Sequence, residues 1–202
     1  MKSKTNKVIS PEYYQSDDVV QLARSLLGKE LHTFLDNQRT SGLIVEVEAY
    51  CGASDRACHA YRNKLTPRTR TMFKKGGICY VYLVYGMHHL FNIVTNIEGN
   101  ADAVLVRAIE PNTGLEIMKE RRGINADNKL LTGGPARVTQ ALGITTGNNE
   151  TDLTGNKIWL TNGRTYNKSE IVASTRIGVE YAGPDALLPW RFYIRGNKYV
   201  SK

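Results

Sequence analysis

Two glutamates and a tyrosine alternate along one short run of the chain. Glu46, Glu48 and Tyr50 lie in the sequence LIVEVEAY at residues 43–50. Because side chains alternate along a strand, these three share one face, and the apolar residues between them face the core. A partly buried carboxylate is the group that a general base requires. The other interpretation is a pair of rim carboxylates on a solvated sheet face, which the residues alone favour.

Two more polar residues interrupt apolar runs. Arg107 follows the sequence VLV at residues 104–106, and Asn92 lies between Phe91 and Ile93. A buried charge needs an acceptor partner, and a buried amide needs hydrogen bonds. A structural salt bridge for Arg107 and a satisfied structural amide for Asn92 therefore stand beside any functional interpretation.

Aromatic residues gather in the same part of the chain, where five of the eleven tyrosines lie between residues 50 and 85. Tyr80 and Tyr82 are spaced as a strand, and such aromatic stripes usually belong to a core. The functional alternative is a stacking surface for a base that has left the duplex. Tyr85 precedes Gly86 at the predicted tip of a β-hairpin, where little sheet is available for packing. Its position suits a wedge that enters a DNA minor groove.

Positive charge is concentrated between these aromatic residues. The chain has 27 Lys and Arg against 19 Asp and Glu, a formal net charge of +8. Six of the positive residues lie between positions 61 and 75, where no acidic residue occurs: Arg62, Lys64, Arg68, Arg70, Lys74 and Lys75. The segment is either a solvated loop or the contact surface for a polyanionic partner.

These residues must be positioned by a mixed set of elements. Apolar periodicity and turn residues predict one α+β domain over residues 11–202, preceded by a flexible basic arm at residues 1–10. The predicted strands are 30–35, 43–50, 79–84, 87–95, 103–109, 157–160, 171–179 and 191–194, with the hairpin between the third and the fourth. The predicted helices are 16–26, 113–122 (opened by a capping box at Thr113) and 135–142, and residues 125–131 are a predicted loop.

Composition excludes several classes of protein. With 202 residues, 41% hydrophobic and 23% charged, the chain is typical of a globular domain with one core. It has no apolar run of eighteen residues and no signal peptide pattern, so we expect a cytoplasmic protein without a membrane segment. Cys51, Cys58 and Cys79 form no C-x-x-C pair, and no histidine motif accompanies them. We therefore expect neither a disulfide framework nor a metal site.

Three segments together resemble the alkyladenine (3-methyladenine) DNA glycosylase family. They are VEVEAY, CHAYRNKLTPRTRTMF and YVYLVYGMHHLFN, and the resemblance extends from Tyr14 to Ser201. It implies that Glu48 is the base, which deprotonates a water that attacks the anomeric carbon of a deoxyribose. Arg107 and the backbone carbonyl of Ile177 would hold this water. No lysine matches a nucleophile, so a monofunctional enzyme without a lyase step is expected.

The same resemblance assigns a purine pocket. Tyr50 would lie on one side of the extruded base, with Tyr82 and His59 on the other. His59 and the backbone N–H of Ala57 would contact the purine edge. Asn92 would be a gate at the pocket floor that obstructs the exocyclic amine of guanine.

Contacts with DNA complete the implied site. Tyr85 would intercalate, and Met87 would press on an adjacent base pair. Lys64, Thr66, Arg68 and Arg70 would contact the DNA backbone. The resemblance further implies a curved, mainly antiparallel sheet with surrounding helices and a protruding hairpin. The expected partner is damaged double-stranded DNA, bound by a monomer without a cofactor, at the nucleoid if the source is bacterial.

Two rival functions remain beside a glycosylase for alkylated or deaminated purines. The first is a non-catalytic nucleic-acid-binding module that uses the same basic segment and aromatic hairpin. The second is a sugar hydrolase that uses Glu46 and Glu48 together. It is disfavoured, because residues two apart on one strand do not face each other across a bound sugar. The residues leave open the role of Glu46 and the range of lesions.

Overall fold

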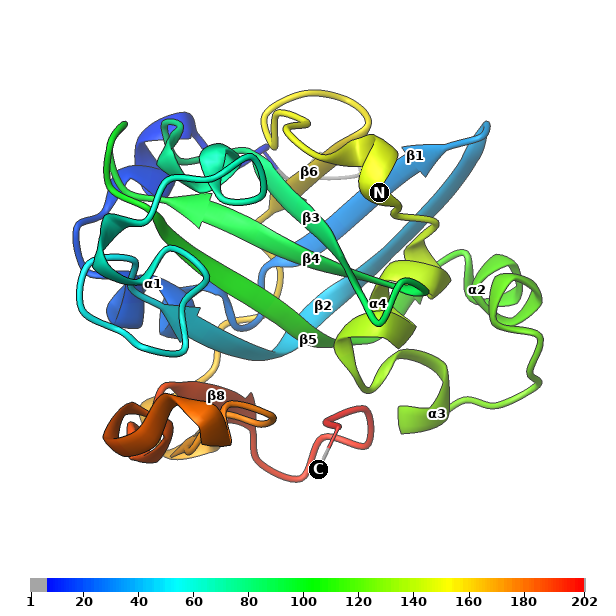
Figure 1. Cartoon of the computed structure of the whole chain (residues 1–202). Helices are drawn as coiled ribbons and strands as arrows, with labels where there is room; N and C mark the ends of the chain where they lie inside the picture. The colour runs from blue at the N-terminus through cyan, green and yellow to red at the C-terminus, as the bar shows by residue number, and fades with distance from the viewer. Residues whose placement is uncertain (1–6, 202) are drawn as a thin grey trace.

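An antiparallel sheet of eight strands is the frame of the molecule (Figure 1). The computed structural model describes residues 7–201. The strand order is β3-β4-β5-β2-β1-β6, and β8 pairs with both β2 and β7. The strands are β1 (Glu30–Leu35), β2 (Gln38–Tyr50), β3 (Cys79–Val84), β4 (His88–Thr95), β5 (Asp102–Thr113), β6 (Ile158–Thr161), β7 (Ile171–Ser174) and β8 (Arg191–Ile194). The α+β class and the mainly antiparallel sheet are therefore confirmed.

Short helices surround this sheet. They are α1 (Val19–Leu26), α2 (Leu115–Arg122), α3 (Lys129–Thr132) and α4 (Pro135–Leu142), with 3-10 turns η1 (Pro11–Gln15), η2 (Tyr61–Asn63), η3 (Arg70–Phe73), η4 (Thr146–Asn148), η5 (Lys168–Glu170) and η6 (Glu180–Leu187). In Figure 1, α2, α3 and α4 gather at one end of the sheet, and α1 lies near the other. Among residues 7–201, no helix combines the length and the apolar character needed to cross a membrane.

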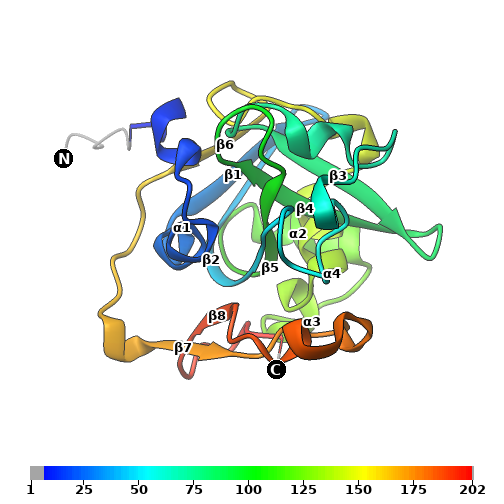
Figure 2. The same ribbon diagram turned by 60° about the vertical axis from the view of Figure 1, so that its left-hand side comes forward.

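Strand β2 is central, and both of its faces are covered. It pairs along one edge with β5 and along the other first with β1 and then with β8. The C-terminal segment with β7, β8 and η6 lies on one side of it (Figure 2). Glu46 and Glu48 are both 0% exposed, and so is their neighbour Ile44. The interpretation of these glutamates as rim carboxylates on a solvated face is therefore wrong, because a segment distant in the sequence covers that face.

The hydrophobic core joins the sheet to the flanking helices. Along α1 the buried positions recur at helical spacing, and they pack with β2 and with Leu142 of α4 in one cluster. Asp18 caps α1 by accepting a hydrogen bond from the Gln21 N–H at 2.9 Å. The helix therefore begins at Val19 rather than at the predicted Ser16, and η1 is a separate turn before it.

Several other boundaries differ from the predictions. α2 begins after Gly114, which adopts φ 75°, and no capping box forms at Thr113 because that residue pairs with Ser41 at the end of β5. α3 lies partly within the predicted loop 125–131, where the Asn128 side chain caps it. β7 ends at Ser174 instead of residue 179. The strands β3 and β8 and the helix α4 match their predicted bounds.

The predicted N-terminal arm is in part attached to the sheet. Val8 forms an antiparallel bridge with Thr161 of β6, and the Ile9 N–H donates to the Leu160 carbonyl at 2.9 Å. Ile9 is also buried. Residues 8 and 9 thus pair with β6 at the edge of the sheet. This part of the predicted arm is therefore not flexible. Residues 1–6 of the predicted arm lie outside the described residues.

The β3–β4 hairpin projects from the body of the molecule (Figure 2). Its turn places Tyr85 at φ 53° and Gly86 at φ 69°, and the Met87 N–H donates to the Val84 carbonyl at 3.2 Å. Two positive φ angles in this turn match the right-handed twist of the strands. A bulky residue at positive φ is strained, and such strain is retained mostly at functional positions. Tyr85 is 90% exposed at this tip.

Candidate active site

A cavity of about 280 Å³ opens between β3, β4 and the segment that follows β7. This volume lies just under the range of roughly 300–1,000 Å³ that is typical of small-molecule sites. Arg107 lines this cavity. So do all six predicted pocket residues, which are Tyr50, Ala57, His59, Tyr82, Asn92 and Ile177. Further lining residues had not been predicted, among them Cys58, Met72, Tyr80, Gly178, Val179 and Tyr181.

Glu48 lies behind this cavity with three hydrogen-bond donors around its carboxylate. Its Oε1 accepts the backbone N–H of Ile177 at 2.8 Å. Its Oε2 accepts the Tyr50 hydroxyl at 2.7 Å and Arg107 Nη1 at 3.3 Å. An ionised carboxylate offers about four acceptor sites, two on each oxygen. Oε2 is therefore fully used, and Oε1 retains one acceptor site beside Ile177.

Arg107 bridges the two glutamates. Its Nε donates to Glu46 Oε1 at 3.1 Å, while Nη1 reaches Glu48. The register of β2 against β5 shifts on both sides of Glu46, leaving Val45 on β2 and Arg107 on β5 without a direct partner. Such bulges re-aim a side chain next to active sites. Burial alone would lower the pKa of Arg107, but the charges of Glu48 and Glu46 outweigh it and raise this pKa.

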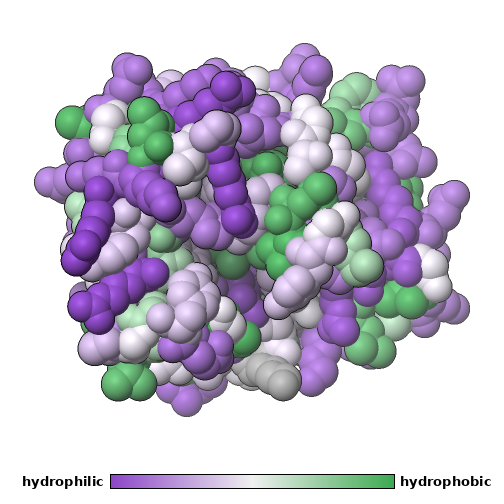
Figure 3. All heavy atoms as spheres, viewed as in Figure 1, coloured by the Kyte–Doolittle hydropathy of each residue, from purple (hydrophilic) through white to green (hydrophobic). Residues whose placement is uncertain are grey.

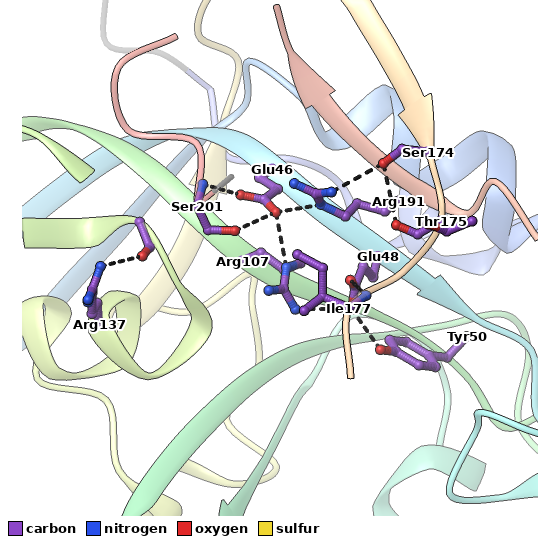
Figure 4. A network of polar contacts seen from close by, with 11 residues as sticks. Glu46, Glu48, Tyr50, Arg107, Arg137, Ser174, Thr175, Ile177, Arg191 and Ser201 are labelled. Carbon is purple, nitrogen blue, oxygen red and sulfur yellow. Dashed lines mark hydrogen bonds and ion pairs between the residues drawn. The ribbon is translucent and has the colours of Figure 1, made fainter. Parts of the chain in front are cut away.

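Glu46 is the centre of a buried polar network (Figure 4). Besides Arg107, it accepts Arg191 Nε at 2.8 Å and the N–H and hydroxyl of Ser201 at 2.7 and 2.8 Å. Burial would raise the pKa of Glu46, but the hydrogen bonds from Ser201 and the charge of Arg107 together lower it. Glu46 is thus an ionised partner for Arg107, held in place by the C-terminal segment.

Three ring side chains of the cavity lining, His59, Tyr80 and Tyr82, pack together. The His59 ring packs edge-on against Tyr82 with centroids 4.7 Å apart, and its Nδ1 lies 3.1 Å from the Tyr80 hydroxyl. Burial and the nearby charge of Arg68 lower the pKa of His59 to about 4. The imidazole is therefore neutral at pH 7 and presents one donor and one acceptor nitrogen.

Arg68 contacts these ring side chains. Its Nη2 lies 3.2 Å from His59 Nε2, and its guanidinium lies 5.0 Å from the Tyr82 ring centroid. The expectation from the resemblance was a contact with the DNA backbone. In the free protein, stacking on Tyr82 and the hydrogen bond to His59 bring this cation to the pocket rim instead.

Two other pocket residues already have polar partners. Asn92 Nδ2 donates to the Tyr80 carbonyl at 3.1 Å, which fixes the amide at the cavity wall. The Ala57 N–H donates to Asp55 Oδ1 at 2.9 Å. The predicted contact of this N–H with a purine edge therefore competes with an intramolecular hydrogen bond.

The remaining predicted contacts lie on the surface around the cavity. Lys64, Arg70 and Met87 are exposed, and the Thr66 N–H donates to Thr69 Oγ1 at 2.8 Å inside the basic segment. Hydrophilic residues dominate the face shown in Figure 3, which is hollowed near its centre, and hydrophobic residues gather at the outer end of the hairpin. This face therefore combines a cavity, a charged segment and an exposed aromatic tip.

Sequence reasoning missed a buried ion pair behind the site. Arg176 donates to both carboxylate oxygens of Asp55, with Nη1–Oδ2 at 2.5 Å and Nη2–Oδ1 at 2.8 Å. The two residues are 121 positions apart, so no local spacing connects them. The one available signal was an arginine inside the predicted strand 171–179, which needed an acceptor.

Comparisons with known proteins identify the family. A family model described as methylpurine-DNA glycosylase matches residues 12–198. A protein of Carboxydothermus hydrogenoformans is 46% identical over 196 residues, covering 96% of this chain and all of the relative. One of Alkaliphilus oremlandii is 43% identical over 190 residues, covering 91% of this chain and 94% of the relative. Both relatives carry the name "Putative 3-methyladenine DNA glycosylase". The chain therefore belongs to the methylpurine-DNA glycosylase family, whose members hydrolyse N-glycosyl bonds.

Proposed function

We propose that this protein is a monofunctional base-excision repair enzyme that extrudes a damaged purine from duplex DNA and hydrolyses its glycosidic bond. The observation that carries the proposal is the free acceptor site on Glu48 Oε1, the oxygen that binds the N–H of Ile177, a residue of the cavity lining. In this proposal, a water hydrogen-bonded there also contacts Arg107 and the Ile177 carbonyl. Glu48 takes a proton from this water as its oxygen attacks C1′.

The proposed reaction is a single displacement. The water oxygen forms a bond to C1′ while the C1′–N bond breaks, and the bonding electron pair leaves with the purine. The products are the free base and an abasic site with a hydroxyl group on C1′. In this proposal the hydrogen bond from Arg107 to Oε2 orients the carboxylate so that Oε1 faces the water.

The aromatic walls are proposed to hold the extruded base. Tyr50, Tyr82 and His59 all line the cavity, and in this proposal the planar purine stacks between Tyr50 on one side and Tyr82 with His59 on the other. Neutral His59 offers a polar contact to the purine edge, and Asn92 obstructs the exocyclic amine of guanine. Stacking of this kind is worth roughly 1–3 kcal/mol per base.

The DNA surface is proposed to surround the cavity mouth. Tyr85 enters the minor groove and fills the space of the extruded nucleotide, with Met87 against a neighbouring pair. Lys64, Thr66 and Arg70 contact backbone phosphates, and Arg68 joins them on leaving the pocket rim. A monomer suffices for this geometry, and we place its work in the cytoplasm, at the nucleoid in a bacterium.

The lesion range follows from leaving-group chemistry. A cationic base such as 3-methyladenine or 7-methylguanine leaves without further protonation, whereas hypoxanthine and ethenoadenine need a proton. A single-turnover release assay on duplexes carrying each of the four lesions tests the proposal, with the undamaged duplex as control. We expect release of 3-methyladenine at least. Binding of all these duplexes without release of any base would favour the non-catalytic nucleic-acid-binding module instead.

A further inference from the structure

The buried pair Asp55–Arg176 lies directly behind the candidate base and outside the cavity lining. Both side chains are 0% exposed, and the guanidinium engages both carboxylate oxygens. Its Nη2 also donates to the Asp185 carbonyl at 3.1 Å. The Arg176 guanidinium packs between two rings, 4.9 Å from the Tyr50 centroid and 5.2 Å from the Trp190 centroid. Both terminal nitrogens of Arg176 are thus hydrogen-bonded.

This pair connects three parts of the site. Arg176 Nη1 donates to the Ala49 carbonyl at 2.8 Å, on the residue between Glu48 and Tyr50. The residue after Arg176 is Ile177, whose N–H donates to Glu48 Oε1. Asp55 Oδ1 accepts the Ala57 N–H at the rim of the cavity. One ion pair therefore sets the spacing between Glu48, Ile177 and the cavity rim at Ala57.

The segment around Ile177 has little other support. β7 ends at Ser174, so residues 175–177 carry no strand pairing, and Gly178 turns at φ 75°. The Arg176 side chain replaces the missing ladder by fixing this segment to β2. Because the Ile177 N–H touches Glu48, a displacement of the segment displaces the water site as well.

The pair is poorly explained as a source of stability. Buried ion pairs are often replaced by apolar residues without loss of stability. In addition, Arg176 Nε is buried and has no hydrogen-bond partner among residues 7–201. An unsatisfied buried donor is a cost that calls for an explanation. Precise placement of the segment supplies one.

We propose that Asp55 and Arg176 form a positioning pair, which holds the Ile177 segment against Glu48 and thereby sets where the attacking water binds. Neither side chain lines the cavity, so they act through Ile177 and Ala57 and make no contact with the substrate. The proposal rests on the proposed function, in which Glu48 activates that water.

Three variants test this role: Arg176→Lys, Asp55→Asn, and the double variant Asp55→Asn/Arg176→Gln. Lysine keeps the charge but loses the two-pronged geometry, and the double variant removes both charges together, which protects folding. The measured quantities are the single-turnover rate constant for 3-methyladenine release and the Kd for an abasic-site duplex. Melting temperatures show which variants are folded at the assay temperature. Ile158→Ala, in β6 at the far edge of the sheet, is the matched control for lost stability.

We expect the folded pair variants to release base at least tenfold more slowly while the Kd changes less than twofold. Ile158→Ala, with a similarly lowered melting temperature, should keep the wild-type rate constant. Wild-type rates in the folded pair variants, or an equal loss in Ile158→Ala, would overturn the positioning role. A wild-type protein that releases no base would overturn the proposed function and this inference together, so the two failures are distinguishable.

Discussion

The hydroxyl of Tyr50 donates a 2.7 Å hydrogen bond to Oε2 of Glu48, two residues earlier on the same strand. Strand alternation places both side chains on one face, so the contact is local and does not depend on the loops. It occupies the oxygen that also binds Arg107 and directs Oε1 toward Ile177. Tyr50 therefore both lines the cavity and orients the Glu48 carboxylate.

Replacing Tyr50 by phenylalanine separates these tasks. The ring remains for stacking, but Glu48 loses one donor, and a hydrogen bond to a charged group contributes about 1.5–3 kcal/mol. We expect the single-turnover rate constant to fall about 10- to 100-fold, with little change in affinity for an abasic-site duplex. Tyr82→Phe, at another tyrosine of the cavity lining, is the control and should lose less. Equal rates for wild type and Tyr50→Phe would remove the hydroxyl from the orienting role.

Glu46 predicts a dependence of stability on pH. The pKa of Glu46 is lowered in the folded protein from its ordinary value of about 4.5, because hydrogen bonds and the charge of Arg107 outweigh burial. The unfolded chain therefore binds more protons near that pH, and stability is present above about 4.5 and is lost as the pH falls through the folded pKa. Urea midpoints measured from pH 7 to pH 3 should drop.

The variant Glu46→Gln tests this dependence. Glutamine removes the negative charge that Arg107 and Arg191 share inside the protein, so we expect a loss of about 3–5 kcal/mol at pH 7. The loss should shrink as the pH falls below about 4.5, because the unfolded chain then binds a proton that the folded protein still excludes. A loss that stays constant over this pH range would show that the ionised form of Glu46 does not stabilise the fold.

These features differ in how far the sequence could predict them. The alternation of side chains in VEVEAY was sufficient to place Glu48 and Tyr50 on one strand face. The turn residues at positions 85 and 86 were sufficient to predict the hairpin of β3 and β4 and its exposed tip. Pro135 at the start of α4 and Gly143 after its end, at φ 74°, mark the bounds of that helix. In each case the signal lies within a few residues of the element.

Contacts between distant segments could not be predicted in this way. Ser201 reaches Glu46 across 155 positions, and Arg176 reaches Asp55 across 121. No periodicity connects such residues. Contacts of this kind bury the face of β2 that the residues alone predicted to be exposed to solvent. The engagement of Arg68 with His59 was missed for another reason, since a cation in a basic run carries no sign of which acceptor it will find.

The exposed hairpin tip gives a prediction about binding. Tyr85 has almost no contact with the rest of the protein at 90% exposure, so Tyr85→Ala should leave the melting temperature within about 1 °C. Affinity for a lesion-containing duplex should fall at least tenfold, because the wedge is lost. Phe34→Ala, an exposed aromatic residue at the far end of β1, is the control. Unchanged affinity in Tyr85→Ala would contradict the wedge.

The basic segment gives a prediction about salt. Arg70 is exposed, whereas Lys74 Nζ is paired with Glu150 Oε2 at 2.5 Å. Each phosphate contact that is lost lowers the slope of log K against log salt concentration by about 1. We expect Arg70→Gln to lower this slope by about 1, and Lys74→Gln to lower it less. Identical slopes for wild type and Arg70→Gln would make Arg70 a solvated residue.

The central claim is that Glu48 activates the attacking water. Its most direct test is the variant Glu48→Gln, which keeps the shape and the acceptor oxygen of the side chain but removes the base. In single-turnover assays on a duplex with 3-methyladenine, we expect release to fall at least a thousandfold while affinity for an abasic-site duplex stays within about threefold of wild type. Release within tenfold of the wild-type rate by a folded Glu48→Gln protein would contradict the claim.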